Sequence, residues 1–368
     1  MRSLVITDSP VWTAEAEYAV SVARAELRAG ALVTFITPGA RFAEAVPDAR
    51  VLELPGSSPS RSPADFLAGA RWLSDLVRRE RFDVIHSARA TAHLMAAVSA
   101  GGSAPIVHLR GGASVPGGHP ANRFLYRRLT RAVIASSARV REWVIERLGL
   151  PSERVHRLLA PVDTSAFRPC GRDAELARSL GIREDAAVVM NVARLAPVKG
   201  QAVLVEAMAH VVATCPRAVL ALVGEPWSGE LESLRRLARR LGLESSVVFA
   251  GRRDDVPSLL GLSSVCVSSS VGSEENSRAV SEYMAAGRPV VATAVGVVPE
   301  LVRDGASGLL VPPRDAAALG RAISSVLLAP DRAARMGSEG RRLAVESFSA
   351  EAFSAGLARV LESAGVAR

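Results

Sequence analysis

This sequence is poor in cysteine, in aromatic residues and in lysine, and each scarcity argues against a class of protein. Three scattered cysteines without CxxC spacing argue against a disulfide framework and against a structural zinc site. Aromatic residues make up 4% of the chain, too few for the stacking platforms of a nucleic-acid binder, so no nucleic-acid partner is expected despite a net charge of +8. This charge favours other anionic ligands, such as phosphorylated substrates or anionic lipid.

Long apolar runs and several common catalytic motifs are also missing. No run reaches the ~18 apolar residues that a membrane-spanning helix needs, and the apolar N-terminal stretch is too short for a secretory signal. We therefore expect a cytoplasmic protein, or one bound peripherally to the inner face of the cytoplasmic membrane. The absence of GxGxxG after the first apolar run and of GxxxxGKS/T argues against a dinucleotide-dependent dehydrogenase and a P-loop NTPase, and neither GxSxG nor HExxH occurs.

What the sequence does contain is a regular alternation of two patterns. Short β-branched runs alternate with segments rich in Ala, Leu and Arg, which is typical of parallel sheets covered by helices. Strands are predicted at residues 3–7, 32–37, 51–54, 83–86, 105–109 and 132–136, and again at 186–192, 218–223, 247–250, 265–268, 289–293 and 308–311. Helices are predicted between and after them, among others at residues 122–130, 201–212, 316–327, 331–348 and 350–364.

The alternation pauses once, at a segment rich in proline and turn residues, residues 160–171. At 368 residues the chain accommodates two domains of ordinary size. The predicted fold is therefore α/β, with two Rossmann-like domains, residues 1–165 and 171–347, facing each other across a cleft. A C-terminal helix within residues 348–368 is predicted to pack back on the N-terminal domain. In such sheets, ligands bind at the carboxyl ends of the strands.

The first candidate site is the turn between a predicted strand and the helix predicted at 201–212, which carries Arg194 and Lys199. Two cations beside the positive end of a helix dipole form a phosphate-binding arrangement. Lys199 is the only lysine among 45 basic residues, which indicates a place that the wider, planar head of arginine does not fit. The alternative is an ordinary solvated loop, and we favour the phosphate site.

The second candidate site follows the strand predicted at 265–268. Asn276 or Ser277 is predicted to cap a helix running to about residue 286, with Glu274 in the loop before it and Glu282 inside it. These carboxylates are too far apart to share a proton. They suit instead the hydroxyl groups at two ends of one extended ligand. The amides of the first helical turn lie between them and can bind a diphosphate in the middle of that ligand. The alternative, acids that only complement a helix dipole, would be preferred without the first site.

The order of these motifs resembles that of the retaining GT-B glycosyltransferases of family 4. Their pattern is an Arg…Lys-Gly loop and an E-x7-E motif, followed by A-x-G-x-P-V-V-A-T, a G…E-x-V segment and D-G-x-x-G-x-L-V. The corresponding segments here are Arg194…Lys199-Gly200, Glu274…Glu282 and residues 286–293, 296–302 and 304–311. Order and spacing agree over residues 188–319, and residues 162–169 resemble the interdomain V-D-x-x-x-F-x-P of the family.

The resemblance implies a donor site in the C-terminal domain and an acceptor side in the N-terminal domain. Arg194 and Lys199 would hold the donor diphosphate, Glu274 the hydroxyls of the transferred sugar, and Glu282 the ribose. Family members are typically metal-independent, and this chain has no DxD-like pair, so we expect no metal site and no cofactor besides the nucleotide-sugar co-substrate. Three further residues would present backbone amides to the phosphates: Asn276, Ser277 and Arg278.

The N-terminal half resembles the family less closely. Where many members carry a Gly-Gly turn after the first strand, residues 12–17 contain no glycine, and where many place a histidine this chain has Gly111. Arg110 is a substitute charge partner at that place, and we expect it to contribute to donor binding. Three histidines are also candidates for the cleft, although each is more simply explained as structural: His86, His108 and His119.

Seven arginines crowd residues 123–147, where only Glu142 and Glu146 oppose them. Apolar residues are interleaved with them: Phe124, Leu125, Tyr126, Trp143 and Val144. The stretch forms either a basic surface that faces an anionic membrane or two solvated amphipathic helices. The sequence favours neither interpretation over the other.

The function expected from these features is the transfer of a hexose or heptose from a nucleotide-sugar donor to a cell-envelope glycan or glycolipid, as in lipopolysaccharide or polysaccharide biosynthesis. A glycogen-type phosphorylase would need a lysine for pyridoxal phosphate, whereas the single lysine lies in the diphosphate loop. A hydrolysing nucleotide-sugar epimerase remains open. So does a nucleotide-sugar-binding or scaffold subunit with weakened catalysis, suggested by residues 13–15 and by Gly111.

Overall fold

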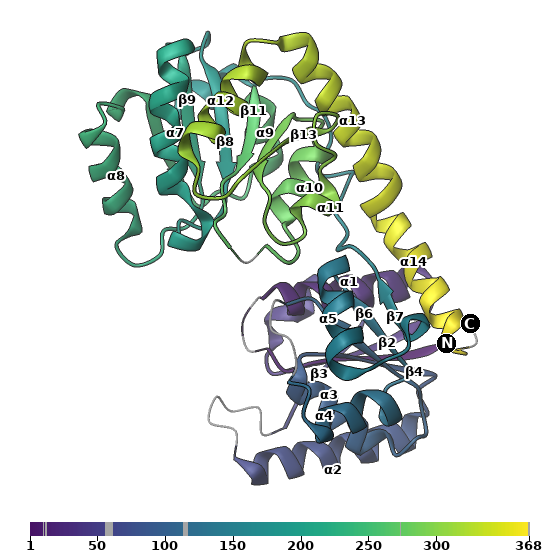
Figure 1. The fold of residues 1–368 in the computed structure, drawn as a ribbon. Helices are drawn as coiled ribbons and strands as arrows, with labels where there is room; N and C mark the ends of the chain where they lie inside the picture. The colour runs from purple at the N-terminus through teal and green to yellow at the C-terminus, as the bar shows by residue number, and fades with distance from the viewer. Residues whose placement is uncertain (10, 12, 56–61, 113–116, 273, 367–368) are drawn as a thin grey trace. The chain divides into compact units, whose positions relative to one another are not determined.

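The structure, a computed structural model, describes residues 1–9, 11, 13–55, 62–112, 117–272 and 274–366. Its contacts divide the chain into two compact units, residues 1–161 together with 350–368, and residues 162–349. We call them the N-terminal unit and the C-terminal unit (Figure 1). Each is built on one parallel sheet covered by helices, so the predicted α/β class with two Rossmann-like domains is confirmed.

The sheet of the N-terminal unit has seven parallel strands in the order β3-β2-β1-β4-β5-β6-β7. They are β1 Arg2–Thr7, β2 Leu32–Thr37, β3 Arg50–Glu53, β4 Val84–Ala88, β5 Ile106–Arg110, β6 Ala132–Ala135 and β7 Val155–Arg157. The first six match predicted strands to within two residues. The prediction missed β7, because only Val155 of its three residues is apolar and no alternation is visible over so short a segment.

The described part of this unit contains six α-helices. They are α1 Ala14–Arg28, α2 Pro63–Glu80, α3 Ala90–Ala100, α4 Pro120–Phe124, α5 Ala138–Leu148 and α14 Ala350–Ser363. The helix predicted at 122–130 is wrong in its extent, because α4 ends at Phe124 and a π-helical turn, η2, follows at Leu125–Leu129. The Thr130 hydroxyl donates to the Leu125 carbonyl at 3.0 Å, which closes the wider turn and ends the segment.

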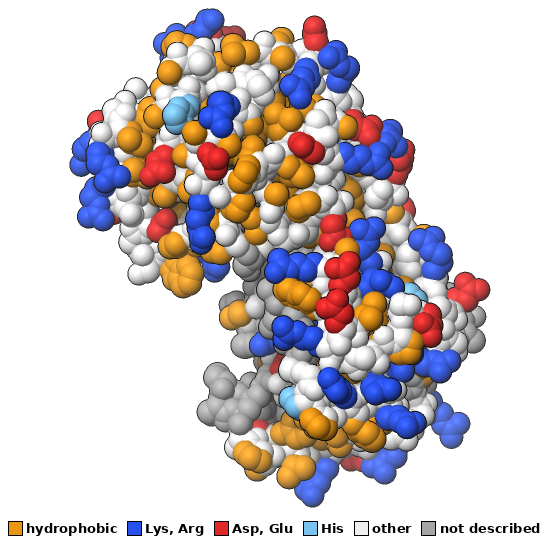
Figure 2. All heavy atoms as spheres, in the orientation of Figure 1, with side chains coloured by type: hydrophobic (Ala, Val, Ile, Leu, Met, Phe, Trp, Pro, Cys, Tyr) orange, Lys and Arg blue, Asp and Glu red, His pale blue; other side chains and the backbone are white. Residues whose placement is uncertain are grey.

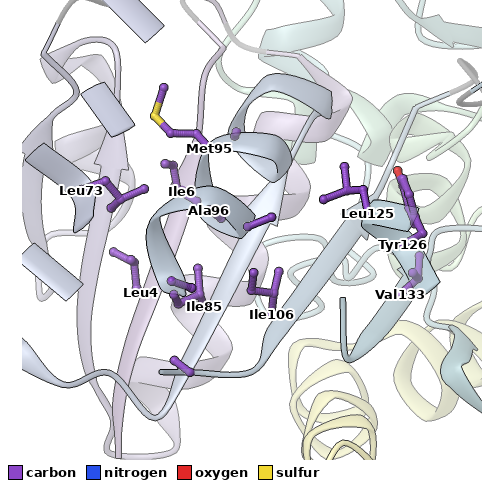
Figure 3. Packing of buried hydrophobic residues seen from close by; sticks show 14 of the residues in the cluster. Leu4, Ile6, Leu73, Ile85, Met95, Ala96, Ile106, Leu125, Tyr126 and Val133 are labelled. Carbon is purple, nitrogen blue, oxygen red and sulfur yellow. The ribbon is translucent and has the colours of Figure 1, made fainter. Parts of the chain in front are cut away.

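The core of the N-terminal unit fills both faces of its sheet. On one face, side chains of β1, β4 and β5 pack under α2 and α3; Figure 3 shows among them Leu4, Ile6, Leu73, Ile85 and Met95. The other face is covered by α1 and α14, whose Tyr18 and Phe353 rings meet edge to face with centroids 5.6 Å apart.

The C-terminal unit has a six-stranded parallel sheet in the order β10-β9-β8-β11-β12-β13. Its strands are β8 Ala187–Val192, β9 Ala218–Val223, β10 Val247–Gly251, β11 Val265–Ser268, β12 Val290–Thr293 and β13 Gly308–Val311, all as predicted to within one residue. Its helices are α6 Ala174–Ser179, α7 Gln201–Thr214, α8 Glu230–Arg240, α9 Val256–Leu262, α10 Arg278–Ala285, α11 Val298–Leu301, α12 Ala316–Leu327 and α13 Pro330–Phe348. The chain reverses its direction of strand addition between β8 and β11, which is where such sheets bind ligands.

The segment that resembles the interdomain motif belongs to the C-terminal unit. The Val162 amide donates to the Phe348 carbonyl at 2.8 Å. The Arg341 side chain of α13 donates to the carbonyls of Thr164 and Phe167 at 3.0 and 2.9 Å, and also to that of Ala285 at 2.7 Å. One guanidinium thus fixes residues 162–167 to the end of α10, the helix that carries Glu282.

Candidate active site

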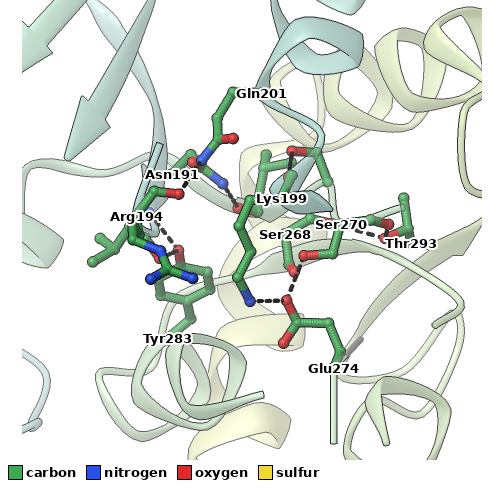
Figure 4. Close-up of polar contacts among 12 residues, drawn as sticks. Asn191, Arg194, Lys199, Gln201, Ser268, Ser270, Glu274, Tyr283 and Thr293 are labelled. Atoms are coloured by element: carbon green, nitrogen blue, oxygen red, sulfur yellow. Dashed lines mark hydrogen bonds and ion pairs between the residues drawn. The ribbon is translucent and has the colours of Figure 1, made fainter. Parts of the chain in front are cut away.

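The loop that carries the first pair of cations leaves the sheet at the end of β8. Tyr283 of α10 anchors the start of this loop, because its hydroxyl accepts a hydrogen bond from the Val192 amide at 2.7 Å. The Gln201 side chain, at the start of α7, donates to the Arg194 carbonyl at 3.0 Å. The Arg194 guanidinium lies 5.1 Å from the ring centroid of Trp227, a cation–π distance. Figure 4 shows Arg194 and Lys199 projecting from this loop on the side of Glu274 and Tyr283.

Gly200 brings the Lys199 backbone against the segment that follows β11. Its φ of +66° lies in the left-handed region, and a Cβ there would approach the Ser269 carbonyl oxygen to 2.0 Å. The Ser269 hydroxyl in turn donates to the Lys199 carbonyl at 3.0 Å. Only glycine permits this close approach, which explains why the lysine is followed by glycine.

Lys199 and Glu274, which are 75 residues apart in sequence, meet in an ion pair. The Lys199 Nζ lies 2.5 Å from Glu274 Oε1, and the Ser270 hydroxyl donates to the same carboxylate oxygen (Figure 4). Thr293 of β12 steadies that contact, because its hydroxyl donates to the Ser270 carbonyl at 2.6 Å. The Glu274 side chain is only 8% exposed, so the carboxylate is held in one place by a cation and a hydroxyl.

A second glycine holds the backbone of Glu274. Gly296 has a φ of +58°, and a Cβ there would lie 2.2 Å from the Glu274 carbonyl oxygen. The next amide, that of Val297, donates to the same oxygen at 2.8 Å. The loop after β12 therefore fixes the position of the Glu274 backbone. Gly296, which begins the G…E-x-V segment, is required there because any side chain would clash with that backbone.

Glu282 lies on α10 and is paired with Arg278 one turn earlier, at 2.6 Å between Arg278 Nε and Glu282 Oε1. The carboxylate is 8% exposed and the guanidinium 62% exposed. Ser277 occupies the N-cap position, as predicted, but its side chain makes no capping bond, and its φ of +38° is unusual for a residue with a side chain. Its hydroxyl therefore does not compete for the first amides of α10.

A cavity of about 610 Å³ in the C-terminal unit joins these elements. Six of the predicted site residues line it: Arg194, Lys199, Glu274, Ser277, Arg278 and Glu282. Asn276 directly precedes Ser277 in the chain but is not among the lining residues, and Arg110 belongs to the N-terminal unit. The sequence interpretation missed other lining residues, among them Asn191, Arg253, Ser270 and Tyr283. Asn191 could have been identified, because it is a lone amide side chain inside an apolar strand.

The composition of the cavity suits an anion that also carries hydroxyl groups. Four basic side chains and the N-terminus of α10 supply donors and positive potential, and three carboxylates, those of Asp254, Glu274 and Glu282, supply acceptors for hydroxyls. Within the described residues, no group of three His, Cys, Asp or Glu side chains is arranged to hold a metal ion. The basic side chains that an anion bound in this cavity would meet are those of Arg194, Lys199, Arg253 and Arg278.

The candidates in the N-terminal unit are brought together only in part, because Arg110 and His119 line one cavity and His86 does not. Arg110 ends β5 and is 4% exposed. His86 is fully buried and paired with Glu26, its Nε2 lying 3.2 Å from the carboxylate. His119 accepts from the Asn122 amide at 3.3 Å and so caps α4, while His108 is stacked on His93 with ring centroids 3.8 Å apart. The residues that replace the Gly-Gly turn begin α1, with the Thr13 hydroxyl accepting from the Ala16 amide, and Trp12 lies outside the described residues.

The buried side chain of His93 should make the free energy of unfolding depend on pH. Burial, reinforced by the charge of Arg110, lowers the pKa of His93 to about 3. Below the ordinary histidine pKa of ~6.5 the unfolded chain takes a proton that the folded chain refuses, so the free energy of unfolding should fall by ~1.4 kcal/mol per pH unit towards pH 3.

Urea unfolding of wild type and His93→Gln at pH 7 and pH 5 measures this contribution. The glutamine amide keeps a donor for the Thr130 hydroxyl, which His93 Nε2 contacts at 2.7 Å. We expect the wild type to lose roughly 2 kcal/mol more than the variant over this interval. Equal losses in both proteins would mean that His93 is protonated in the folded state.

Comparison with known proteins places both halves of the chain. The family described as "Glycosyl transferases group 1" matches residues 173–343, and the one described as "Glycosyltransferase Family 4" matches residues 16–166. A D-inositol 3-phosphate glycosyltransferase of Streptomyces scabiei is 36% identical over 213 residues, which are 55% of this chain and 47% of the relative. A GDP-mannose-dependent alpha-(1-6)-phosphatidylinositol monomannoside mannosyltransferase of Mycolicibacterium smegmatis is 33% identical over 228 residues, 59% of each chain.

The chain thus spans about half the length of the curated relatives it matches. Solved structures cover it almost completely. A glycosyltransferase from Rickettsia africae superposes with a TM-score of 0.85 at 20% identity over 98% of this chain and 97% of the other. HepE from Anabaena, solved in complex with UDP, superposes with a TM-score of 0.83 at 24% identity over 99% and 100%. At these identities the superpositions show the shared fold.

Proposed function

Since the chain belongs to the GT-B glycosyltransferases of family 4, we propose that it transfers a hexose or heptose from a nucleotide-sugar donor to an acceptor hydroxyl. The observation that carries the proposal is the cavity of the C-terminal unit, in which Lys199 pairs with Glu274 while Arg278 pairs with Glu282. These pairs place two cations and two buried carboxylates in the wall of one cavity. A nucleoside diphosphate sugar offers the complementary groups, two phosphates between two sets of hydroxyls.

The roles follow from position. Lys199 and Arg194 lie at the start of α7 and bind the diphosphate, assisted by the amides that begin α10 at Asn276, Ser277 and Arg278. Glu274, held by the Lys199 ammonium, accepts from the hydroxyls of the sugar next to the diphosphate. Glu282, inside α10, accepts from the ribose hydroxyls at the opposite end of the diphosphate.

The reaction needs stabilisation of the leaving group above all. As the bond from the anomeric carbon to the β-phosphate oxygen breaks, negative charge grows on the departing diphosphate, beside Lys199 and Arg194. The acceptor oxygen bonds to the same face of the sugar, and its proton leaves to the departing phosphate, so configuration is retained. We favour this transfer over a hydrolysing epimerase and over a binding-only subunit, because every charged residue of the family pattern in the C-terminal unit is present.

The acceptor we propose is a cell-envelope glycan or glycolipid, of the kind used in lipopolysaccharide or polysaccharide biosynthesis. One curated relative is named for a phosphatidylinositol mannoside, a glycolipid, and another for an inositol phosphate. A lipid-linked acceptor fits a cytoplasmic protein that works at the inner face of the membrane.

A thermal-shift screen with UDP-, GDP- and ADP-sugars tests donor binding first. A ligand at 100 times its Kd should stabilise the protein by ~2.7 kcal/mol. Proton NMR of the product formed from the stabilising donor then reports the anomeric configuration, and incubation without acceptor separates transfer from epimerisation or hydrolysis. If none of the donors stabilises the protein, the proposed function is wrong.

Turnover should be independent of divalent metal. We propose this because the four basic side chains that line the cavity can neutralise the diphosphate without a metal ion. Rates measured with 5–10 molar equivalents of EDTA, and again after adding Mg²⁺ or Mn²⁺, should agree to within about twofold, ~0.4 kcal/mol. Loss of activity with chelator and recovery with either metal would refute this account of the site.

An exposed part of the N-terminal unit supports a membrane contact, although it is smaller than the predicted surface. Leu125, Tyr126 and Val144 are buried and do not contribute to it. Arg131 and Arg141 bond to backbone carbonyls, and Arg139 stacks on Trp143 at 4.4 Å. The exposed basic and large apolar residues of α4 and η2 form what we call the arginine patch: Arg123, Phe124, Arg127, Arg128 and Leu129. Figure 2 shows basic and hydrophobic side chains side by side on the face that carries α4.

We propose that the arginine patch binds anionic phospholipid. Three of its arginines line a cavity of about 530 Å³ beside Arg154, whose guanidinium donates to the carbonyls of Tyr126 and Arg127. Phe124, 59% exposed, adds an apolar group to the same surface. Among the described helices, none combines the length and the apolar character needed to span a bilayer.

Vesicle sedimentation tests the patch. Changing Arg123, Arg127 and Arg128 to glutamine should weaken binding to vesicles with 30% phosphatidylglycerol by about a hundredfold, since each arginine near the surface contributes ~1 kcal/mol. A charge-matched control changes Arg235, Arg236 and Arg240, which are exposed on α8 of the C-terminal unit. If both triple variants lose the same affinity, net charge alone accounts for binding and the patch has no special role.

A further inference from the structure

The guanidinium of Arg110 is buried without a counter-charge. The residue is 4% exposed, and its Nε has no hydrogen-bond partner. Among the described residues no carboxylate forms an ion pair with it. A buried arginine in this state is costly, since the charge has lost water and gained no counter-charge.

The side chains closest to Arg110 do not supply negative charge. Two of them are the stacked rings of His93 and His108, and the third is Tyr126, which meets both rings edge to face at 4.6 and 5.4 Å. Burial, together with the positive charge of Arg110, lowers the pKa values of His93 and His108, while burial raises the pKa of Tyr126. Both imidazoles and the phenol are therefore neutral at ordinary pH, and none of them places a negative charge beside Arg110.

Arg110 forms part of the wall of a cavity of about 550 Å³ in the N-terminal unit. None of the described residues that line it is acidic. The cavity also meets the start of α3, at Ala90 and Thr91, where no side chain caps the helix. Amides of this first turn and the helix dipole add positive potential.

Further donors and an apolar wall complete the cavity. His119 accepts from the Asn122 amide through Nδ1, so its neutral ring carries the proton on Nε2. Phe66 and Leu94 supply apolar surface on the same lining. A volume of this size accommodates one sugar or polyol ring with a charged group attached.

We propose that this cavity binds the phosphate group of a phosphorylated acceptor, with Arg110 as its principal contact. The proposal rests on the proposed function, because it needs an acceptor distinct from the nucleotide-sugar donor. It assigns Arg110 to the acceptor, whereas the sequence suggested a role in donor binding. A guanidinium matches two phosphate oxygens with two parallel N–H bonds, and the α3 amides meet the remaining charge.

The phosphate is carried either by a soluble sugar phosphate or by a lipid, and two probes separate these sources. Glucose 6-phosphate represents the soluble monoester, with glucose as its uncharged control. Short-chain phosphatidylglycerol below its micelle concentration represents the lipid phosphodiester, with short-chain diacylglycerol as control. The proposal expects binding of at least one charged probe and of neither control, and the tighter probe identifies the source.

Arg110→Met and Arg110→Lys test the contact, with Arg50→Met, an exposed arginine of the same unit, as the matched control. Calorimetry should show the Kd of the charged probe weakened by about tenfold or more in Arg110→Met and partly restored in Arg110→Lys. Without probe, Arg110→Met should melt no lower than wild type, because a buried unpaired charge has been removed. His119→Ala removes another side chain of the cavity wall and leaves Arg110 in place. It should weaken binding of the charged probe by a smaller factor than Arg110→Met does.

Nucleotide-sugar binding is measured on the same proteins to separate the two proposals. An unchanged donor Kd in Arg110→Met, with the phosphate probe lost, supports the acceptor assignment. A donor Kd that weakens as much as the probe Kd overturns it in favour of donor binding. A phosphate probe that binds wild type and Arg110→Met equally, or a marked fall in melting temperature on removing the charge, overturns it as well, whether or not a nucleotide sugar binds.

Discussion

Glu274→Gln should lower kcat by about a hundredfold to a thousandfold while changing the Kd for free nucleoside diphosphate by less than threefold. The carboxylate is 8% exposed and accepts from both Lys199 and Ser270. Glutamine keeps the shape and one acceptor oxygen, so both contacts survive without the charge. What is lost is the negative charge beside the reacting sugar, which matters most when that sugar becomes cationic in the transition state.

Glu282→Gln is the matched control, because it makes the same chemical change in an equally buried carboxylate of the same cavity. Glu282 is assigned to the ribose, so this variant should weaken nucleoside diphosphate binding by about tenfold and affect kcat less. Steady-state kinetics with the donor found by thermal shift, and calorimetry with the nucleoside diphosphate alone, separate the two patterns. Equal losses in kcat and in Kd for both variants would contradict the assignment of one glutamate to each end of the donor.

Both Rossmann-like folds were predictable because their strands are buried on both faces. Segments such as residues 218–223 and 265–267 are continuous apolar runs with no alternation, which is typical of parallel sheets under helices. The strand β7 escapes this rule, since two of its three residues are His156 and Arg157. Its place at the sheet edge is given by pairing with β6, a contact between distant parts of the chain.

The C-terminal site was predictable as a set of residues but not as an arrangement. Spacing alone identifies Lys199 and Glu274 as members of a motif, yet 75 residues separate them and no local pattern predicts a 2.5 Å contact. That contact depends on Gly200 and Gly296, whose missing side chains let three loops meet. A sequence shows that a glycine is present, whereas the atom that a Cβ would strike becomes visible only in the fold.

Burial is the property that sequence reasoning judged least well in the N-terminal unit. Leu125 and Tyr126 alternate with arginines, so their pattern suggests an exposed amphipathic helix, but the π-helical turn directs both into the core. Arg110 shows the converse error, because a charged residue at the end of a strand is normally solvated and this one is buried. In both cases tertiary packing overrides the local preference of the segment.

Lys199→Arg should be nearly as damaging as Lys199→Ala, with kcat/KM lowered about tenfold to a hundredfold in both. Losing a charge-assisted contact to a phosphate oxygen costs roughly 1.5–3 kcal/mol, which is one to two decades in rate. Arginine would restore the charge but not the geometry, since its donors are fixed in a plane and its head is wider than an ammonium.

The structure adds a steric reason to this expectation. Lys199 Nζ contacts a carboxylate that Ser270 also holds, and the Lys199 backbone is pressed against Ser269 by the left-handed Gly200. Both ends of the side chain are therefore fixed by contacts, and we expect a longer, planar group to disturb them. We infer that this arrangement favours the lone lysine among 45 basic residues.

Steady-state kinetics on wild type, Lys199→Arg and Lys199→Ala decide the matter, with Arg217→Ala as the control. Arg217 carries the same charge in the same unit, is 71% exposed and pairs with Asp185 away from the cavity. Its loss should leave kcat/KM within about twofold, ~0.4 kcal/mol. If Lys199→Arg also stays within twofold of wild type, charge alone suffices at this position and the contact with Glu274 sets no geometric requirement. If it falls with Lys199→Ala, the compact ammonium is required where the diphosphate binds.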